Sequence, residues 1–469
     1  MSVHFVFLIA YSLLMVGVGL WVGRLVRSGG DFFVAGRGLS PGLLFSTFLA
    51  ANIGAGSTVN ATALAYREGL SAWWWNGSAG IGSLLLAFWI GPRIWRLAKA
   101  RQYLTVGDFL HDRFGRGVAG LVAVLIWLGS LSILAAQLIG VAAVLAVVGG
   151  VPPVVGSLIG AAVMTAYFAA GGLLSSAWVN RVQLVVLLAG FLLALPFAVA
   201  HAGGPAALTA GDVARLDFWY TSGAGSGWTW LIVLGPAFIV SPGLLQKAYG
   251  ARDERAIRWG IGATAAALML FAFVPVIFGM AAAAQFPGLE NADLALPSIL
   301  TGGLPPAMGA LALAAVFSAE VSSADAVLFM LSTSAARDLY QGFVNPTATD
   351  AQIVRMARWA AFAGGLIGVG LSLVYATIAG ALTTFYSLLT VTLFVPVLGG
   401  LLLPRAGARE ALAAILAGVP ALLGAHVTTG GRGFGLWTPT LVGLAVAAVA
   451  FGVSYVTPRR TTEIPSRSS

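Results

Sequence analysis

The chain has 469 residues and a formal charge of +9 at pH 7, and 59% of its residues are hydrophobic while only 9% are charged. A mean hydropathy of +0.93 excludes an ordinary soluble domain, because apolar runs this dense are typical of membrane helices. The absence of cysteine excludes disulfides and thiolate sites. The histidines are scattered and form no metal cluster. The basic residues lie in short loops, which indicates lipid contact and topology rather than nucleic-acid binding.

Apolar segments of about 20 residues predict an all-α integral membrane protein with about thirteen spanning helices. The first, 3–24, has no basic residue before it and is long enough to cross, so a cleaved signal peptide is not expected. If the N-terminus is outside, the 25 basic residues fall in inner segments, with three exceptions: Arg67, Arg215 and Arg432. Lys247 is one of the residues counted as inner. This distribution predicts a cytoplasmic tail at 457–469. The spans are centred near residues 13, 53, 82, 132, 163, 189, 238, 270, 320, 365, 391, 418 and 446.

The second apolar run contains a stretch that disfavours a continuous helix. Residues 49–57 read LAANIGAGS, and glycines with small polar residues have weak helix propensity. A break at membrane depth is tolerated only where the freed backbone lines a cavity or a site. The stretch therefore predicts a binding site buried within the membrane.

The seventh apolar run, 228–247, is interrupted as well, by Gly-Pro at 235–236 and Ser-Pro-Gly at 241–243. Two interrupted runs five helices apart indicate an inverted-repeat transporter with its site where the broken helices face each other; ordinary Gly and Pro kinks are the alternative. The predicted repeats are 41–200 and 228–403. An extra helix at 3–24 precedes them, and two more follow within 409–456.

The ninth run supplies a cluster of oxygen atoms. Ala319, Ser322 and Ser323 are spaced i, i+3 and i+4, so on a helix the two hydroxyls point back toward the carbonyl of the first residue. A hard, singly charged cation needs such an oxygen cage, completed by carbonyls from an unwound helix such as the one near Ile53. The alternative is that the serines are small residues for close helix packing.

Several segments together resemble the sodium:solute symporter family. They are DFFVAGRGL at 31–39, AANI at 50–53, the glycine pair 171–172 with 178–183, and SSAD at 322–325 followed by ARDLY at 336–340. The resemblance covers most of the chain. It implies a LeuT-type five-plus-five inverted repeat, sodium as the coupling ion and a small-molecule solute as cargo.

The resemblance also implies roles for single residues. Sodium would be held by the carbonyls of Ala50, Ile53 and Ala319 and the hydroxyls of Ser322 and Ser323. The solute would lie beside the break. Residues of the Trp73–Trp75 run have an alternative interpretation, because aromatic residues also form a belt at the membrane interface. The candidate wall residues are Asn52, Gly54, Gly56, Ser57, Trp75, Asn76, Gln137 and Phe238, of which Gln137 and Phe238 have helix packing as their alternative.

Four further residues are coupling candidates, namely Asn180, Arg181, Glu320 and Asp325. Many family members carry an aspartate where Asn180 stands, and its loss predicts one sodium per solute. Glu320 replaces an expected apolar residue, and an acid at membrane depth is usually paired, protonated or functional. It is expected either to pair with Arg181 or to carry a proton, which would make transport proton-coupled.

The expected solute is small and neutral or zwitterionic, such as an amino acid or a related nutrient. Gly56 and Ser57 stand where some sugar-transporting relatives place charged and amide side chains, and the fourth span has no arginine. A site without a fixed cation suits a strongly anionic solute poorly. A monocarboxylate or a sugar is the alternative.

No acid–base pair or metal-ligand set marks a membrane face, so an enzyme is not expected. A transporter-like solute sensor is the competing class, although the tail after Pro458 is too short for a signalling domain. We expect a multi-pass protein of a bacterial plasma membrane whose partners are the solute, sodium and the lipid bilayer, with no nucleic acid and no obligatory protein partner.

Overall fold

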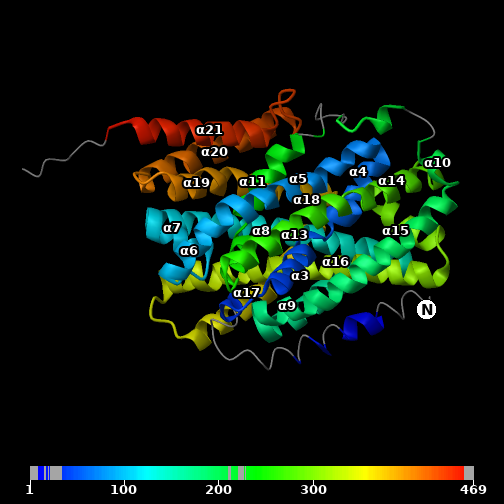
Figure 1. The fold of residues 1–469 in the computed structure, drawn as a ribbon, viewed down its shortest axis with the longest axis horizontal. Helices are drawn as coiled ribbons and strands as arrows, with labels where there is room; N and C mark the ends of the chain where they lie inside the picture. Colours follow the sequence, from blue (N-terminus) through cyan, green and yellow to red (C-terminus); the bar gives the residue numbers. More distant parts are fainter. Residues whose placement is uncertain are drawn as a thin grey trace, which may run out of the picture.

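The computed structural model describes residues 9–14, 17–18, 21, 34–209, 213–219, 227 and 229–458. Within them the chain is a bundle of long helices that lie side by side (Figure 1). Among the residues described, nine helices are long and apolar enough to cross a membrane, or ten if one bent pair is counted as a single span. The chain is therefore a multi-pass membrane protein in its described part.

The predicted count of thirteen spans is not confirmed. Most of the predicted helix 3–24 lies outside the described residues. The fifth predicted span corresponds to an apolar helical stretch, Pro153–Ala166, that is short for a span, and the second and third together form the bent pair. The fifth and sixth predicted spans also lie on one helix, α9 (Pro153–His201), in which the second apolar stretch is Ser176–His201.

The predicted break in the second run is present. Helix α3 (Pro41–Asn52) begins at Ser40, whose hydroxyl accepts the Leu43 N–H, and ends at Ile53, where ψ is 95°. The chain then resumes as a π-helical turn, Gly56–Asn60, and as α4 (Ala61–Glu68). The two parts meet at 64°.

The seventh run is also interrupted, but at one of the two predicted places. Helix α11 (Thr229–Val240) continues through Pro236 and ends before Ser241, whose ψ of 121° is not helical. Helix α12 (Pro242–Tyr249) follows at once. The interruption is therefore the Ser-Pro-Gly sequence, and the Gly-Pro pair lies within a helix.

Helix α16 (Pro306–Thr333) lies in the middle of the bundle and packs against α3, α8 (Arg116–Gly149) and α9. Nearly all of its residues from Ala312 to Thr333 are buried. Because this helix carries the predicted oxygen cluster, its position brings the cluster against the broken α3. The other helices are α5 (Trp73–Leu85), α6 (Gly91–Arg101), α7 (Val106–Phe114), α10 (Pro205–Thr209), α13 (Glu254–Phe271), α14 (Phe273–Gln285), α15 (Ala295–Gly302), α17 (Asp350–Ser372), α18 (Ile378–Leu389), α19 (Val395–Leu402), α20 (Ala408–Thr429) and α21 (Pro439–Val456).

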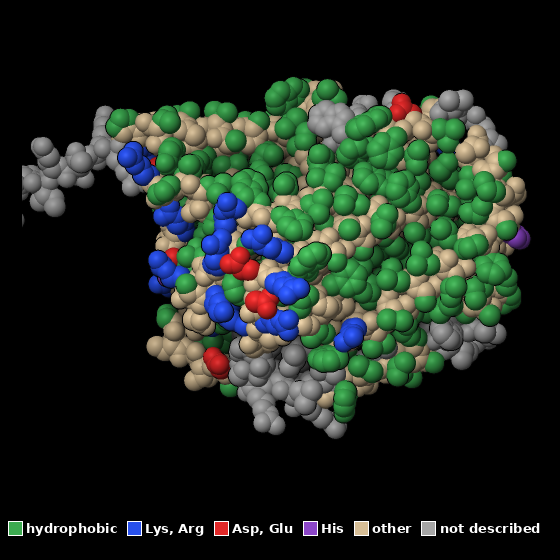
Figure 2. All heavy atoms as spheres, viewed as in Figure 1, with side chains coloured by type: hydrophobic (Ala, Val, Ile, Leu, Met, Phe, Trp, Pro, Cys, Tyr) green, Lys and Arg blue, Asp and Glu red, His purple; other side chains and the backbone are tan. Residues whose placement is uncertain are grey.

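Hydrophobic and basic side chains occupy different parts of the outer surface. On the face shown in Figure 2, hydrophobic side chains cover the middle of the bundle, and Lys and Arg gather at the end where α6 and α7 lie. Helices α20 and α21 pack against each other at one edge (Figure 1). An apolar girdle with basic residues at one end is the arrangement expected of a membrane protein with a fixed orientation.

Candidate functional site

Side chains from neighbouring helices and from the turn itself satisfy backbone groups that the break in α3 sets free. The Ala55 N–H donates to Gln137 Oε1 at 2.9 Å, and the Ser57 hydroxyl donates to the Asn52 carbonyl at 2.5 Å. Asn76 Nδ2 donates to the Ser57 carbonyl at 3.0 Å. The break is thus a built feature, because each of these buried polar groups has found a partner.

Gly54 is the position where the break meets α16 most closely. A Cβ at Gly54 would collide with the Ser323 side chain and lie 2.7 Å from Gln137 Oε1. Only glycine therefore allows the unwound backbone to lie directly against the hydroxyl of Ser323.

Four of the five residues predicted to hold sodium, Ala50, Ala319, Ser322 and Ser323, bring oxygen atoms together at this contact. Ser322 Oγ lies 2.9 Å from the Ala50 carbonyl oxygen and 3.0 Å from that of Ala319, and its one hydrogen can be donated to either. Ser323 Oγ lies 3.4 Å from the Ala50 carbonyl and 3.1 Å from that of Ala51. Ile53 is buried at the bend itself. The donor set, carbonyl and hydroxyl oxygens from an unwound segment and a facing helix, has the chemistry that a hard monovalent cation requires.

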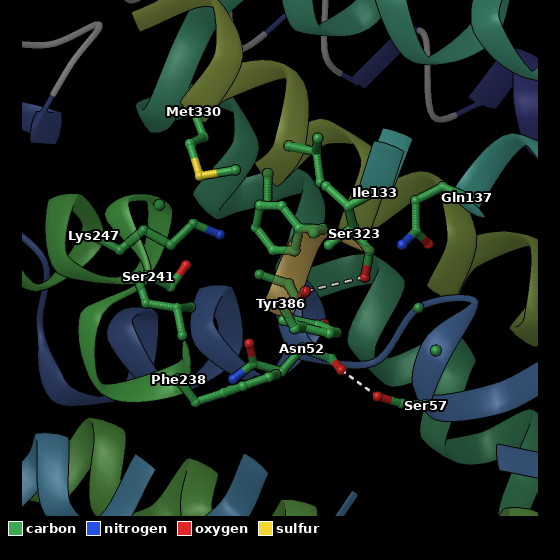
Figure 3. Close-up of a pocket in the computed structure, with 18 residues that line it drawn as sticks. Asn52, Ser57, Ile133, Gln137, Phe238, Ser241, Lys247, Ser323, Met330 and Tyr386 are labelled. Atoms are coloured by element: carbon green, nitrogen blue, oxygen red, sulfur yellow. Dashed lines mark hydrogen bonds between the residues drawn. The ribbon is translucent and has the colours of Figure 1, made fainter. Parts of the chain in front are cut away.

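A narrow cavity of about 60 Å³ lies between the two interruptions (Figure 3). Its wall contains six of the eight predicted solute-binding residues: Asn52, Gly54, Gly56, Ser57, Gln137 and Phe238. Ser323 of the oxygen cluster lines the same cavity. The structure therefore places the predicted cation site and the predicted solute site side by side.

Trp75 and Asn76 lie behind the wall and do not line the cavity. Trp75 is buried, and its ring packs against those of Trp230 and Tyr386 with centroids 4.8 and 6.3 Å apart. Asn76 holds the Ser57 carbonyl, as described above. Both residues support the wall from the second layer in this conformation.

Several wall residues were not predicted from the sequence, and Lys247 is the most important of them. It was counted among the basic residues of inner segments, but its side chain is 1% exposed and lines the cavity. This correction has a physical basis, since a lysine near the end of an apolar run is indistinguishable from a loop residue when only charges are counted. The interruption at Ser241 was the available signal, because Ser241 and residues of the helix that follows it line the cavity. Other missed wall residues are Ile133, Ser241, Met330, Phe385 and Tyr386.

Asn180 and Asp325 belong to one buried polar cluster near the oxygen set. Ser176 donates a hydrogen bond to Asp325, and Asn180 Nδ2 lies 3.3 Å from the Ser176 hydroxyl and 3.4 Å from that of Thr47. Lys247 Nζ donates to the Thr47 carbonyl at 3.1 Å. Lys247 and Asp325 interact electrostatically. Asn180 supplies no carboxyl to this cluster, but Asp325 does.

Glu320 lies on another side of α16, against the turn that follows the break. Thr58 Oγ1 is 3.1 Å from Glu320 Oε1 and 2.9 Å from the Gly54 carbonyl, and Glu320 is fully buried. The predicted pair with Arg181 is wrong, because Arg181 is exposed and its guanidinium lies 5.9 Å from the ring centre of Trp178. Among the described residues no basic side chain forms a salt bridge with Glu320.

Comparison with known proteins identifies the family. The model of the "Sodium:solute symporter family" matches residues 32–418. The high-affinity choline transporter 1 of Drosophila melanogaster is 25% identical over 411 residues, covering 82% of this chain and 65% of the relative. The sodium/glucose cotransporter of Vibrio parahaemolyticus is 24% identical over 400 residues, covering 75% of this chain and 71% of the relative.

A solved structure shares the architecture of almost the whole chain. The substrate-bound, outward-open state of a Na⁺-coupled sialic acid symporter superposes with a TM-score of 0.84 at 17% identity and covers 97% of both chains. This likeness shows the LeuT-type fold. Since the family model covers more than half of the sequence, the chain belongs to the sodium:solute symporter family of membrane transporters.

Proposed function

We propose that this protein is a sodium-coupled uptake carrier that moves one small organic solute with one sodium ion by alternating access. The observation that carries the proposal is the convergence of the Ser322 and Ser323 hydroxyls on the carbonyls of Ala50 and Ala51, beside a cavity between two interrupted helices. Sodium at this contact would hold α16 against the break and complete the cavity wall. A ligand shifts a conformational equilibrium only by its differential affinity for the states, so sodium must favour the outward-facing state.

The test is a thermal-shift titration of the purified protein with NaCl against KCl at constant ionic strength. A sodium-specific rise that follows mass action, about 2.7 kcal/mol at a hundredfold excess over Kd, is expected for the wild type and is lost in Ser322→Ala. Ser332→Ala is the matched control, because Ser332 is buried on the same helix and donates only to its own helix, at Phe329. Equal effects of the two salts on the wild type would contradict the proposal.

A single sodium per solute is supported by the charges around Asn180. Asp325 is the carboxyl of this cluster, and the buried Lys247 offsets its charge. A second sodium ion would therefore find little uncompensated negative charge. Uptake into proteoliposomes at known sodium and solute gradients measures the stoichiometry, and a coupling ratio of two would overturn this part of the proposal.

Proton coupling through Glu320 is the second candidate function, and one observation favours it. Thr58 has a single hydroxyl hydrogen but two close acceptors, the Gly54 carbonyl and Glu320 Oε1. If that hydrogen goes to Gly54, a protonated Glu320 must be the donor to Thr58. Transport by Glu320→Gln is then expected to lose the pH dependence of the wild type, and unchanged pH dependence would exclude the idea.

The same flux measurement separates a carrier from a solute sensor, since a sensor would bind without net uptake.

We also propose the repeat boundaries 41–200 and 228–403, the terminal helices 3–24 and 409–456 and the cytoplasmic tail 457–469. An outer N-terminus and a bacterial plasma membrane complete the proposal. The gathering of basic side chains at one end of the molecule supports this orientation (Figure 2).

A further inference from the structure

We propose that Lys247 anchors the carboxylate of the transported solute, so that the cargo is a small carboxylate or amino acid and not a sugar or an alcohol. The inference rests on the proposed function, because it concerns the same cavity. It narrows the expectation of a neutral or zwitterionic solute, which depended on a site without a fixed cation.

The contacts of Lys247 leave it available to a ligand. Its ammonium group donates one hydrogen bond, to the Thr47 carbonyl at 3.1 Å, and an ammonium group has three N–H donors. No carboxylate of the described residues lies within salt-bridge distance of it. Asp325, which interacts with it over a longer distance, is held by Ser176 and does not line the cavity. In Figure 3 the ammonium group points inward from α12.

A buried ammonium group with unfilled donors is costly in a membrane protein unless a ligand or a function compensates for it. Lys247 is 1% exposed and faces a cavity. A carboxylate bound there would accept charge-assisted hydrogen bonds, which are about twice as strong as neutral ones. A hydroxyl or an amide would leave the ammonium group with Asp325, which lies beyond salt-bridge distance, as its counter-charge.

A second donor faces the same space. The Asn52 side chain lines the cavity, and its Nδ2 atom has no hydrogen-bond partner in the structure. Ser323 of the proposed sodium site is a further polar member of the wall. A carboxylate between Lys247 and the sodium ion would therefore meet two positive charges.

The rest of the wall limits the remainder of the solute. Phe238, Ile133, Met330 and the ring of Tyr386 are apolar surfaces of the cavity, and its volume is about 60 Å³. A pocket of this kind orients a ligand by a few polar groups and holds the rest by apolar contact. A carboxylate on a short, largely apolar carbon skeleton fits both features.

The experiment compares matched solutes on the purified protein in NaCl. The probes are acetate, propionate, lactate and alanine, each against its primary amide, with glucose as the neutral reference, and the readout is the solute-dependent thermal shift. The wild type is expected to respond to at least one carboxylate with an apparent affinity at least tenfold higher than to its amide. Equal responses to the acid and the amide, or no response to any carboxylate, would overturn the inference without any variant.

Variants then assign the preference to Lys247. Lys247→Met is expected to lose the tenfold preference and Lys247→Arg to keep a large part of it. Lys99→Met is the matched control, since Lys99 is the chain's other lysine and lies exposed on α6. A Lys247→Met protein that keeps the carboxylate preference would contradict the assignment.

The sodium titration without solute distinguishes the two levels of the argument. A wild type with no sodium-specific shift would defeat the proposed function. A sodium-specific shift together with no preference for carboxylates would leave the proposed function standing and defeat only the role of Lys247.

Discussion

Glu320 shows how one small residue can decide whether a buried carboxyl fits. Gly140 on α8 faces it, and a Cβ at that position would lie 2.8 Å from Glu320 Oε2 and 3.1 Å from the Ala55 Cβ. Neither neighbour is free to retreat, because Glu320 is held by Thr58 and Ala55 belongs to the break. The carboxyl therefore occupies space that only glycine leaves open.

We expect Gly140→Ala to destabilise the protein by about 1–3 kcal/mol, because overpacking a buried contact costs roughly that much. Gly129→Ala on the same helix is the control, since its Cβ would meet its nearest neighbours at 3.4 and 3.5 Å, which is ordinary contact. Thermal unfolding in detergent compares the two. If both variants unfold at the same temperature, the Glu320 contact is not tight.

Gln137 offers a second test, because its Oε1 atom accepts the Ala55 N–H within the break. Gln137→Met removes the acceptor while keeping the side-chain length, and a buried unsatisfied N–H costs about 1–3 kcal/mol. Gln137→Glu keeps an oxygen at this place and is expected to be less damaging. Unfolding temperatures of the three proteins measure the difference, and a Met variant as stable as the wild type would show that the break does not need this partner.

At the scale of elements, sequence patterns predicted those features that depend on local chemistry. The break in α3 was predictable because residues 49–57 combine glycine with weak helix formers. The oxygen cluster on α16 was predictable because helix geometry brings residues at i, i+3 and i+4 together. The contacts of α12 were not predictable, because the interruption at Ser241 does not by itself say which residues after it face the interior. Lys247, which was counted among the basic residues of inner segments, lies in the cavity wall.

Long-range packing explains the other differences. Trp75 and Asn76 were expected in the wall, but Trp75 packs on Trp230 and Tyr386, which no local pattern connects to it. The Arg181–Glu320 pair was inferred from charge alone, and the two side chains point to different surroundings. Such contacts are set by the tertiary arrangement.

Asp293, in the segment between α14 and α15, ties this connection to α18. Its Oδ2 atom accepts the Ile378 N–H at 3.2 Å, and burial raises the pKa of the Asp293 carboxyl above its ordinary value. Folding therefore favours the neutral form of Asp293 relative to the unfolded chain. Its stabilising contribution is full below the ordinary pKa of the unfolded chain and is lost as the pH rises through the raised pKa of the folded state.

We expect the unfolding temperature of the wild type, relative to Asp293→Asn, to increase as the pH is lowered from 7.5 toward 4.5. The asparagine variant keeps an oxygen acceptor for the Ile378 N–H and does not titrate. A difference between the two proteins that is constant over this range would contradict the argument.

At the scale of the whole molecule, the absence of cysteine makes orientation directly measurable. Single cysteines at Pro404 and Leu436, both exposed and at opposite ends of α20, report on the two sides. We expect a membrane-impermeant maleimide to label Leu436→Cys in intact cells and Pro404→Cys only after permeabilisation. The reverse pattern would invert the proposed topology.

The serine hydroxyls of α16 have a consequence for the return half of the transport cycle. The Ser322 hydroxyl has one hydrogen and lies 2.9 and 3.0 Å from the carbonyl oxygens of Ala50 and Ala319, so it can donate to one of them at a time. In the proposed carrier, a bound sodium ion would use the lone pairs of these oxygens, and the hydroxyl hydrogen would have to turn away. We expect the hydrogen bond to re-form when the ion leaves, so that its making and breaking becomes part of every turnover.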